Sequence, residues 1–284
     1  MTEKSETLEK KILGELKKTG YPTEVISSNI IQQEGWGITH NPSYLDDVEG
    51  CSREYDIRAY KAWHYRTLEE DRELGVFLLI ECKKSEKPWV FFTTIESHSG
   101  IRLGNLLHST KDWLFSNRST SHGRLPDELL REQHHYFRKS RLARTFYEPF
   151  KNQEKSDNTS QMIYSAVMSA IKATLFHEQG EKGIRWATIY YPVIIFSGNL
   201  FEAIVSSVDK IELIPSEHIQ LSFNYILPMN PGNSSLWDCQ KTFIVDIIHE
   251  SYIYQFLKII DEEHTYLASC LEKSFTEQDN KSSA

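Results

Sequence analysis

The chain has no apolar run long enough to cross a bilayer, which would take about 20 consecutive apolar residues. Its opening residues, MTEKSETLEKK, are charged where a secretory signal would be apolar. We therefore expect a soluble cytoplasmic protein with no membrane partner.

Cysteine, glycine and proline are also scarce. The four cysteines are too widely spaced for a zinc site and too few to staple a chain of 284 residues. With only 13 glycines and 9 prolines, but 39% hydrophobic and 12% aromatic residues, the composition excludes disordered and collagen-like classes. It predicts a packed core in a reducing compartment.

Nucleotide-binding loops are missing as well. The sequence contains neither a GxxxxGK[ST] loop nor a GxGxxG turn after a strand, so no nucleoside triphosphate or dinucleotide requirement is expected. The net charge of −8 argues against a general polyanion binder, although it leaves room for a local basic surface.

The apolar periodicity predicts one α/β domain over residues 1–284, with a central sheet and helices packed on it. The run 75–82 should pair antiparallel with 89–95, and 187–196 should form a hairpin with 200–205 across Gly198-Asn199. Residues 97–160 read as an insertion or lid. The expected helices are 5–18, a short one near 127–148, about 162–180 and 252–271; the other expected strands are 53–62, 219–227 and 243–248.

Three charged residues lie in the predicted strands, where burying a charge costs free energy. They are Asp56 within REYDIRA, and Glu81 and Lys83 at the end of GVFLLIECKKS. Residues 81 and 83 of one strand point to the same face, about 6–7 Å apart, while Cys82 points to the opposite layer. If Asp56 lies on the neighbouring strand, two carboxylates meet beside one lysine. Hard oxygen ligands of this kind suit Mg²⁺ with a substrate phosphate, although a solvated edge or a salt bridge is the plainer alternative.

This pattern resembles the PD-(D/E)XK nuclease superfamily. Asp56, a gap of 25 residues and then Glu81-Cys82-Lys83 match its motif, although Tyr55 replaces the usual proline. The stretch LKKTGYPTE, GWGITHNPSYLDD, REYDIRA and LLIECKK is also similar to Mrr-like restriction-endonuclease-like proteins of prokaryotes.

The resemblance implies a restriction-endonuclease-like core with a central mixed β-sheet flanked by helices. It also implies a metal-dependent nuclease that hydrolyses phosphodiesters, with DNA as the expected partner and defence against foreign DNA as a role. Mg²⁺, for which Mn²⁺ can substitute, is expected on Asp56, Glu81 and the Cys82 backbone carbonyl, with Lys83 beside the attacking water. Glu9 is the first choice for a further acid from the opening helix, and Glu24, Asp46 and Asp47 are alternatives.

A basic segment supplies a candidate nucleic-acid surface. Arg102 to Arg144 contains nine basic and four acidic residues, which contrasts with the acidic remainder. Arg138, Lys139 and Arg141 are the residues expected to hold phosphates, and a solvated mixed-charge helix is the alternative.

Three other features of the sequence remain. The pair His134-His135 reads as a polar surface pair, and His177-Glu178 lacks the second histidine of a zinc motif. The helix from Tyr252 to Leu271 has an apolar face that would pack on its own sheet or build a homo-oligomer. The rival to the nuclease is a non-catalytic nucleic-acid-binding or regulatory module of the same fold.

Overall fold

The structure is a computed structural model of the chain. It describes residues 7–46, 49–67, 71–95, 106–109, 133–149, 161–180, 187–207, 209–227 and 240–282. The helices are α1 (Leu8–Leu16), α2 (Tyr21–Gln33), α4 (His135–Arg138), α5 (Gln161–Gly180) and α6 (Ile253–Ser282), with a short 3-10 helix at Glu250–Tyr252. Among these residues, no helix is both long and apolar enough to pass through a membrane.

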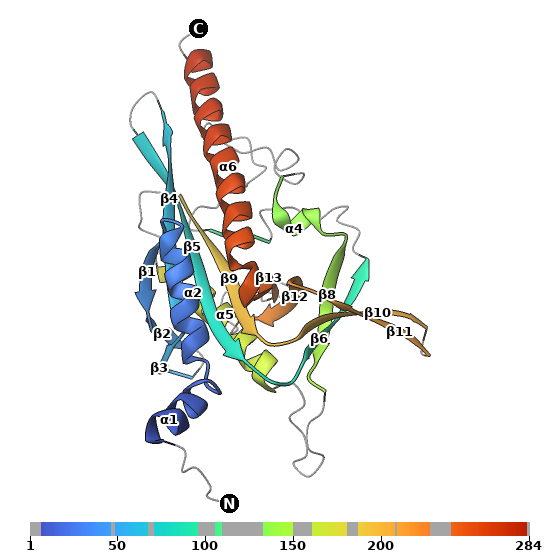
Figure 1. The fold of residues 1–284 in the computed structure, drawn as a ribbon. Helices are drawn as coiled ribbons and strands as arrows, with labels where there is room; N and C mark the ends of the chain where they lie inside the picture. The colour runs from blue at the N-terminus through green and yellow to red at the C-terminus, as the bar shows by residue number, and fades with distance from the viewer. Residues whose placement is uncertain are drawn as a thin grey trace, which may run out of the picture.

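The described strands build one large mixed sheet and a separate hairpin (Figure 1). The sheet runs in the order β1 (Gly37–His40), β4 (Ile57–Arg66), β5 (Asp71–Lys84), β9 (Ala187–Ser197), β13 (Gln240–His249), β12 (His218–Ile226), β8 (Arg141–Tyr147), β6 (Trp89–Ile95), β10 (Leu200–Ser207) and β11 (Lys210–Pro215), with β7 (His108–Ser109) beside β9. The hairpin consists of β2 (Ser43–Asp46) and β3 (Cys51–Glu54). An α/β fold with a mixed central sheet flanked by helices is thus confirmed.

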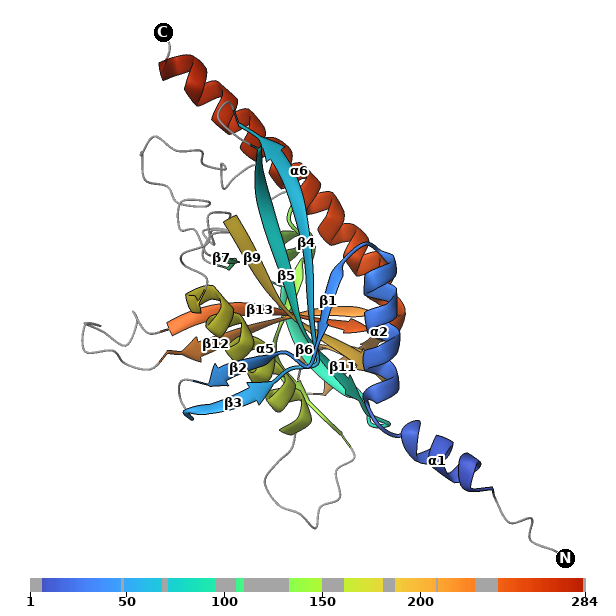
Figure 2. The same ribbon diagram turned by 90° about the vertical axis from the view of Figure 1, so that its left-hand side faces the viewer.

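Helices cover both faces of the sheet at β5. Figure 2 shows α2 and α6 on one face, and α5 with the β2–β3 hairpin on the other. Alternate residues of β5 follow these layers: Leu78 and Ile80 pack with Phe256 of α6, whereas Leu79 packs with Ala173 of α5. A strand buried on both faces needs a continuous apolar run, which explains the composition of β5.

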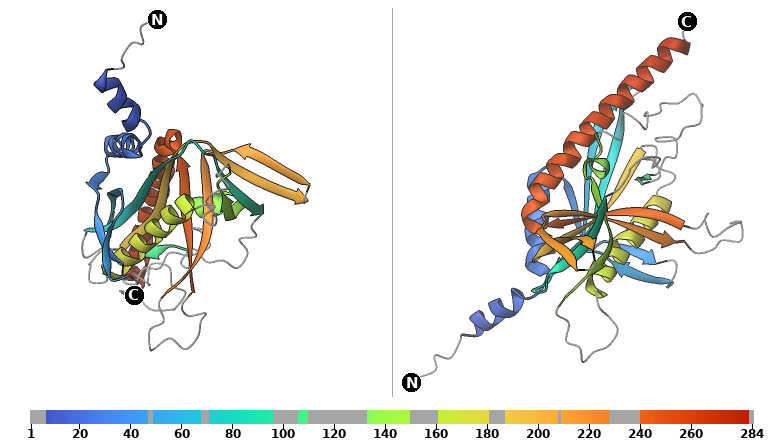
Figure 3. Two further views of the ribbon diagram at one scale, coloured as in Figure 1. Left: turned by 90° about the horizontal axis from the view of Figure 1, so that it is seen from below. Right: turned by 90° about the vertical axis from the view of Figure 1, so that its right-hand side faces the viewer.

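The N-terminal region differs from the expected single helix. The opening helix ends at Leu16, and a second helix, α2, begins at Tyr21 with Pro22 in its first turn. Proline suits the first turn of a helix, because its missing N–H is not needed there, so Pro22 marks the start of α2. All of α1 is exposed and stands apart from the sheet in every view (Figure 3), so α2 is the helix that packs on the core.

Both expected pairings across short turns are wrong. β6 pairs with β8 and β10 rather than with β5, and β10 pairs with β6 and β11 rather than with β9. Instead, β5 and β9 pair with each other in parallel. The strands that follow them in the chain, β6 and β10, form a second parallel pair. Adjacent apolar runs with a short turn suggest a hairpin locally, but pairing with a distant strand decides the topology here.

Gly198 lies where the chain segments that follow β5 and β9 approach each other closely. A Cβ atom at Gly198 would lie 2.5 Å from the carbonyl oxygen of Ser85, which follows β5. The amide of Ser85 also donates to the carbonyl of Ser197 at 3.2 Å. Glycine at position 198 therefore permits a close backbone approach rather than a tight hairpin turn.

The expected insertion and its helix near 127–148 fall largely outside the described residues. Where the region is described, Arg141–Tyr147 is strand β8 inside the main sheet, not a helix, and only His135–Arg138 is helical. At the other end of the chain, α6 continues to Ser282, beyond the expected end at Leu271. Phe256, Ile260 and Leu267 of α6 are buried in the core, so this apolar face packs on the chain's own sheet.

Candidate functional site

Asp56 lies where the chain enters β4, between the end of β3 and Ile57, rather than inside a strand as expected. Ile57 is opposite Ile80 in the antiparallel β4–β5 pair, so Asp56 is brought next to the end of β5. The backbone amide of Cys82 donates a hydrogen bond of 2.6 Å to Oδ2 of Asp56. One carboxylate is thus fixed against the very strand that carries the Glu-X-Lys pattern.

Glu81 and Lys83 share the face of β5 that α5 covers, as the strand geometry predicted. Nζ of Lys83 lies 2.5 Å from Oε2 of Glu81 and 3.6 Å from Oδ2 of Asp56. Ser169 of α5 donates its hydroxyl hydrogen bond to the other oxygen of Glu81. Cys82 points the opposite way and packs in the core beneath α6. The structure therefore brings the predicted trio together.

A third acid, Glu24, lies near this group on α2. Glu24 is mostly buried, lies 3.7 Å from Nδ1 of His40 and interacts electrostatically with Asp56 and Lys83. Glu9, the first-choice helical acid, is exposed on α1. The acid from the helix that packs on the sheet is Glu24, one of the three alternatives; Asp46 is buried and paired with Arg53 and Lys172, and Asp47 lies outside the described residues.

The electrostatics of the group favour a bound cation. Burial and then the charge of Asp56 raise the pKa of Glu24. Burial also raises the pKa of Glu81, with Asp56 adding to it and Lys83 opposing it. Burial opposes the charge of Lys83, but Glu81 and Asp56 outweigh it and raise the pKa of this lysine. Two carboxylates beside one lysine, with Glu24 near enough to interact with Asp56, leave a surplus of negative charge in a partly desolvated place.

The donor set fits Mg²⁺. Carboxylate oxygens of Asp56 and Glu81, with the Cys82 carbonyl, are hard ligands of the kind that this ion prefers, and it commonly takes only one or two protein carboxylates. Partial exposure of Asp56 and Lys83 leaves room for water and substrate.

Of the three basic residues expected to bind phosphate, one is exposed and two are hydrogen-bonded to strands of the sheet. Arg138 is exposed at the end of α4. Lys139 donates from Nζ to the carbonyl of His218, and Arg141 donates from Nε to the hydroxyl of Thr93 at 2.9 Å. The latter two therefore hold strands of the sheet, while the segment from 110 to 132 lies outside the described residues.

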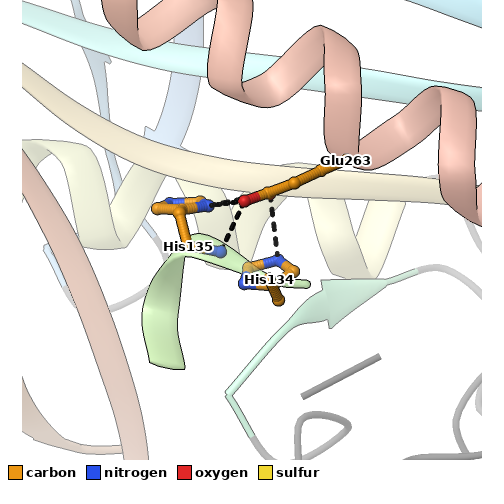
Figure 4. A group of neighbouring side chains, drawn as sticks. All are labelled: His134, His135 and Glu263. Atoms are coloured by element: carbon orange, nitrogen blue, oxygen red, sulfur yellow. Dashed lines mark hydrogen bonds and ion pairs between the residues drawn. The ribbon is translucent and has the colours of Figure 1, made fainter. Parts of the chain in front are cut away.

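His134 and His135, expected at the surface, are buried together with Glu263 of α6 (Figure 4). Helix α6 lies on the face of the sheet opposite α5, whose Ser169 contacts Glu81 (Figure 2). The expected surface pair is thus wrong. Their ring nitrogens and the Glu263 carboxylate are close enough to one another to hold a metal ion. Two adjacent polar residues carry no periodic signal that separates a core position from an exposed one.

The hydrogen bonds assign this cluster to charge pairing rather than to metal binding. Nδ1 of His134 accepts from the amide of Tyr136, so its proton sits on Nε2, which faces the Tyr191 hydroxyl at 3.0 Å. Both ring nitrogens of His135 face carboxylates, Glu263 at 2.9 Å and Asp246 at 3.1 Å. A histidine ligand needs a bare nitrogen, and these bonds leave none on either ring. The cluster joins α4 and α6 to β13.

Comparison with known proteins gave no relative. No family model matches the chain, and no curated protein or solved structure matches it significantly. The α/β class therefore stands on the architecture itself, and any activity must be argued from the geometry of the site.

Proposed function

We propose that this protein is a metal-dependent nuclease of the PD-(D/E)XK type, which hydrolyses phosphodiester bonds of nucleic acid. The observation that carries the proposal is the convergence of Asp56, Glu81 and Lys83 at one end of the β4–β5 pair, with Lys83 within 3.6 Å of both carboxylates. Residues that are 25 positions apart in the sequence thus form one charged group at a partly open edge.

The arrangement around this group supports a restriction-endonuclease-like core. Helix α2 precedes an antiparallel set of β1, β4 and β5, and α5 then leads to β9, which lies parallel to β5. This order resembles the superfamily pattern of an acidic helix, a strand that carries the aspartate, an apolar strand that ends in Glu-X-Lys, a helix and a further strand.

Asp56, Glu81 and the Cys82 carbonyl would hold the ion, and Glu24 would add a third carboxylate. A bound Mg²⁺ supplies positive charge to the phosphoryl oxygens and to the attacking water. Ser169 keeps Glu81 in place by its hydrogen bond, and the Cys82 amide does the same for Asp56. These two bonds fix the carboxylates before a substrate arrives, which lowers the cost of assembling the site.

Lys83 serves this chemistry as a cation. Because its pKa is raised, its amino group stays protonated at neutral pH and donates hydrogen bonds. It can therefore orient a water molecule and offset charge that develops on the phosphate in the transition state.

The alternative is a module that binds nucleic acid without cleaving it. The complete set of Asp56, Glu81 and Lys83 favours the enzyme, because members of the superfamily that have lost turnover usually lack one of the three. DNA is the proposed substrate, and defence against foreign DNA is the proposed setting.

The test is incubation with plasmid, linear duplex and single-stranded DNA, and with RNA, in Mg²⁺, Mn²⁺ or EDTA. Metal-dependent cleavage that is lost in Glu81→Gln supports the proposal. Tight binding with no cleavage of any substrate in either metal would favour the binding module. Cleavage that Glu81→Gln retains would point to a contaminating nuclease.

A further inference from the structure

A groove opens beside Glu81 on the α5 face of the sheet. It has a volume of about 620 Å³ and runs between α5 and the β2–β3 hairpin. Tyr44 and Arg53 lie on the hairpin side. This size falls within the range of about 300–1,000 Å³ that is typical of pockets for small organic groups.

Helix α5 forms one wall of this groove, and most of the side chains on that wall are uncharged. The helix buries one face, which includes Ile163, Ala166 and Val167, against the sheet. Its opposite face lines the groove with Gln161, Tyr164, Ser165, Met168, Ser169 and Lys172, at the i, i+3, i+4 spacing of one helical face. Five of these six side chains are uncharged, and the Tyr164 side chain is half exposed.

The charges of the groove do not suit a row of phosphates. Nζ of Lys172 lies 2.6 Å from Asp46 and 3.4 Å from Glu49, and Nε of Arg53 lies 3.0 Å from Asp46. Both cations are therefore already paired. Glu54 and Glu81 add further negative charge to the lining. A flat, uncharged and hydrogen-bonding group fits this wall better than a phosphate does.

We propose that the groove binds the base of a nucleotide next to the phosphate held by Asp56, Glu81 and Lys83, with the base stacked on Tyr164. Gln161 and Ser165 are the hydrogen-bonding groups beside it. A paired base inside a duplex stack cannot enter such a groove, so the bound strand is single-stranded or has one base turned out. This inference rests on the proposed nuclease function for the place of the phosphate.

The test measures binding in EDTA, where no cleavage occurs, to labelled single-stranded DNA, single-stranded RNA and blunt duplex DNA of one sequence. Stacking of a base on an aromatic ring is worth about 1–3 kcal/mol, so Tyr164→Ala should weaken single-strand binding by roughly 5- to 150-fold. Tyr164→Phe keeps the ring and should bind nearly as wild type does. Tyr254→Ala is the matched control, because Tyr254 is 53% exposed on α6 and Tyr164 is 51% exposed.

Selective loss of single-strand binding in Tyr164→Ala, with retention in the other two variants, supports the groove, and the DNA and RNA arms show which sugar it accepts. Wild-type binding by Tyr164→Ala, equal losses for single strand and duplex, or no single-strand binding by wild type overturns it. Binding that depends on Tyr164 without cleavage in Mg²⁺ would sink the nuclease and keep the groove. Cleavage in Mg²⁺ together with single-strand binding that does not depend on Tyr164 would keep the nuclease and overturn the groove.

Discussion

The backbone amide of Cys82 donates a 2.6 Å hydrogen bond to the side chain of Asp56, across the gap between the start of β4 and the end of β5. This bond ties the carboxylate to the strand that carries Glu81 and Lys83. Asp56 thus has a structural role, as the acceptor of this hydrogen bond, and a proposed role as a metal ligand. The hydrogen bond requires only an acceptor oxygen, whereas metal binding also requires the negative charge.

Asp56→Asn should therefore keep the fold and lose the chemistry. The asparagine oxygen can still accept from Cys82, but the negative charge is gone. We expect a melting temperature close to that of wild type, weaker Mg²⁺ binding by calorimetry and no measurable cleavage. A variant that cleaves at the wild-type rate would remove Asp56 from the site.

Lys83→Ala should reduce the rate rather than metal binding. Loss of a positioned hydrogen-bond donor and cation costs about 10²- to 10⁴-fold in turnover, by analogy with general acid–base groups. Metal affinity should stay the same or rise slightly, because a nearby positive charge disfavours a cation. Lys84→Ala, one residue further along β5 and on the opposite face, is the control and should retain activity. Equal losses in both variants would point to general damage of β5.

Two substitutions decide which helix supplies the third acid. Glu24→Gln should weaken Mg²⁺ binding and activity, because its carboxylate interacts with Asp56. Glu9→Gln should leave both unchanged, since Glu9 is exposed on α1, which stands apart from the sheet. Metal titration followed by cleavage assays compares them directly, and a larger effect from Glu9 would reverse the assignment.

Arg138 and Lys139 should behave differently when their charge is reversed. Lys139→Glu places a carboxylate near Asp246 and removes the bond to the His218 carbonyl, so it should destabilise the fold by about 2–5 kcal/mol in urea unfolding. Arg138→Glu changes an exposed side chain and should leave stability within about 0.5 kcal/mol.

Arg138→Glu is therefore the clean test of a phosphate contact. If Arg138 holds a phosphate, the slope of log affinity against log salt should become shallower by about 0.7 to 0.9. An unchanged slope would place the phosphate surface elsewhere.

Stability should fall on the acid side of neutrality because of the buried histidines. Burial lowers the pKa of His134 to about 3 and that of His264 to about 4, so both stay neutral in the folded chain while they take up protons in the unfolded chain below about 6.5. Protons bound by the unfolded state raise stability with pH, so each histidine adds a slope of up to about 1.4 kcal/mol per pH unit between its folded pKa and about 6.5. Urea unfolding at pH 4.5, 5.5 and 6.5 measures this slope.

His135 acts in the opposite direction. Burial alone would lower its pKa, but Glu263 and Asp246 outweigh it and raise the pKa. The stabilisation that His135 contributes is complete below pH about 6.5. It is lost as the pH rises through the raised pKa of His135 in the folded chain, so stability should peak near neutrality. His264→Gln should reduce the acid slope and leave the alkaline one unchanged; a pH-independent wild type would contradict the charge-paired reading of the cluster.

The sequence could predict what depends on local pattern. The apolar runs located the buried strands β5 and β9, and the two-residue period placed Glu81 and Lys83 on one face with Cys82 on the other. Asp56 was found by its spacing, although it precedes β4 rather than lying in it. The class of fold followed from the alternation of strands and helices.

Long-range pairing could not be predicted in the same way. Nothing local says that β5 lies beside β9 rather than β6, because the energy of that choice comes from the whole sheet. Ser169 gave no signal, since a serine at the edge of an amphipathic face is common. Glu24 was named among three alternative acids, but only the helix that begins at Pro22 could have ranked it above Glu9.

The parallel pairing of β5 with β9 has a consequence for synthesis of the chain. Asp56, Glu81 and Lys83 are made early together with β4, but β9, the other neighbour of β5, ends at Ser197, and Ser169 on α5 donates a hydrogen bond to Glu81. At a rate of about 5–20 residues per second, the trio exists for several seconds on the ribosome before β9 emerges. The nascent chain thus carries Glu81 before Ser169 and β9 are present, so the proposed site would be completed only after most of the protein has been translated.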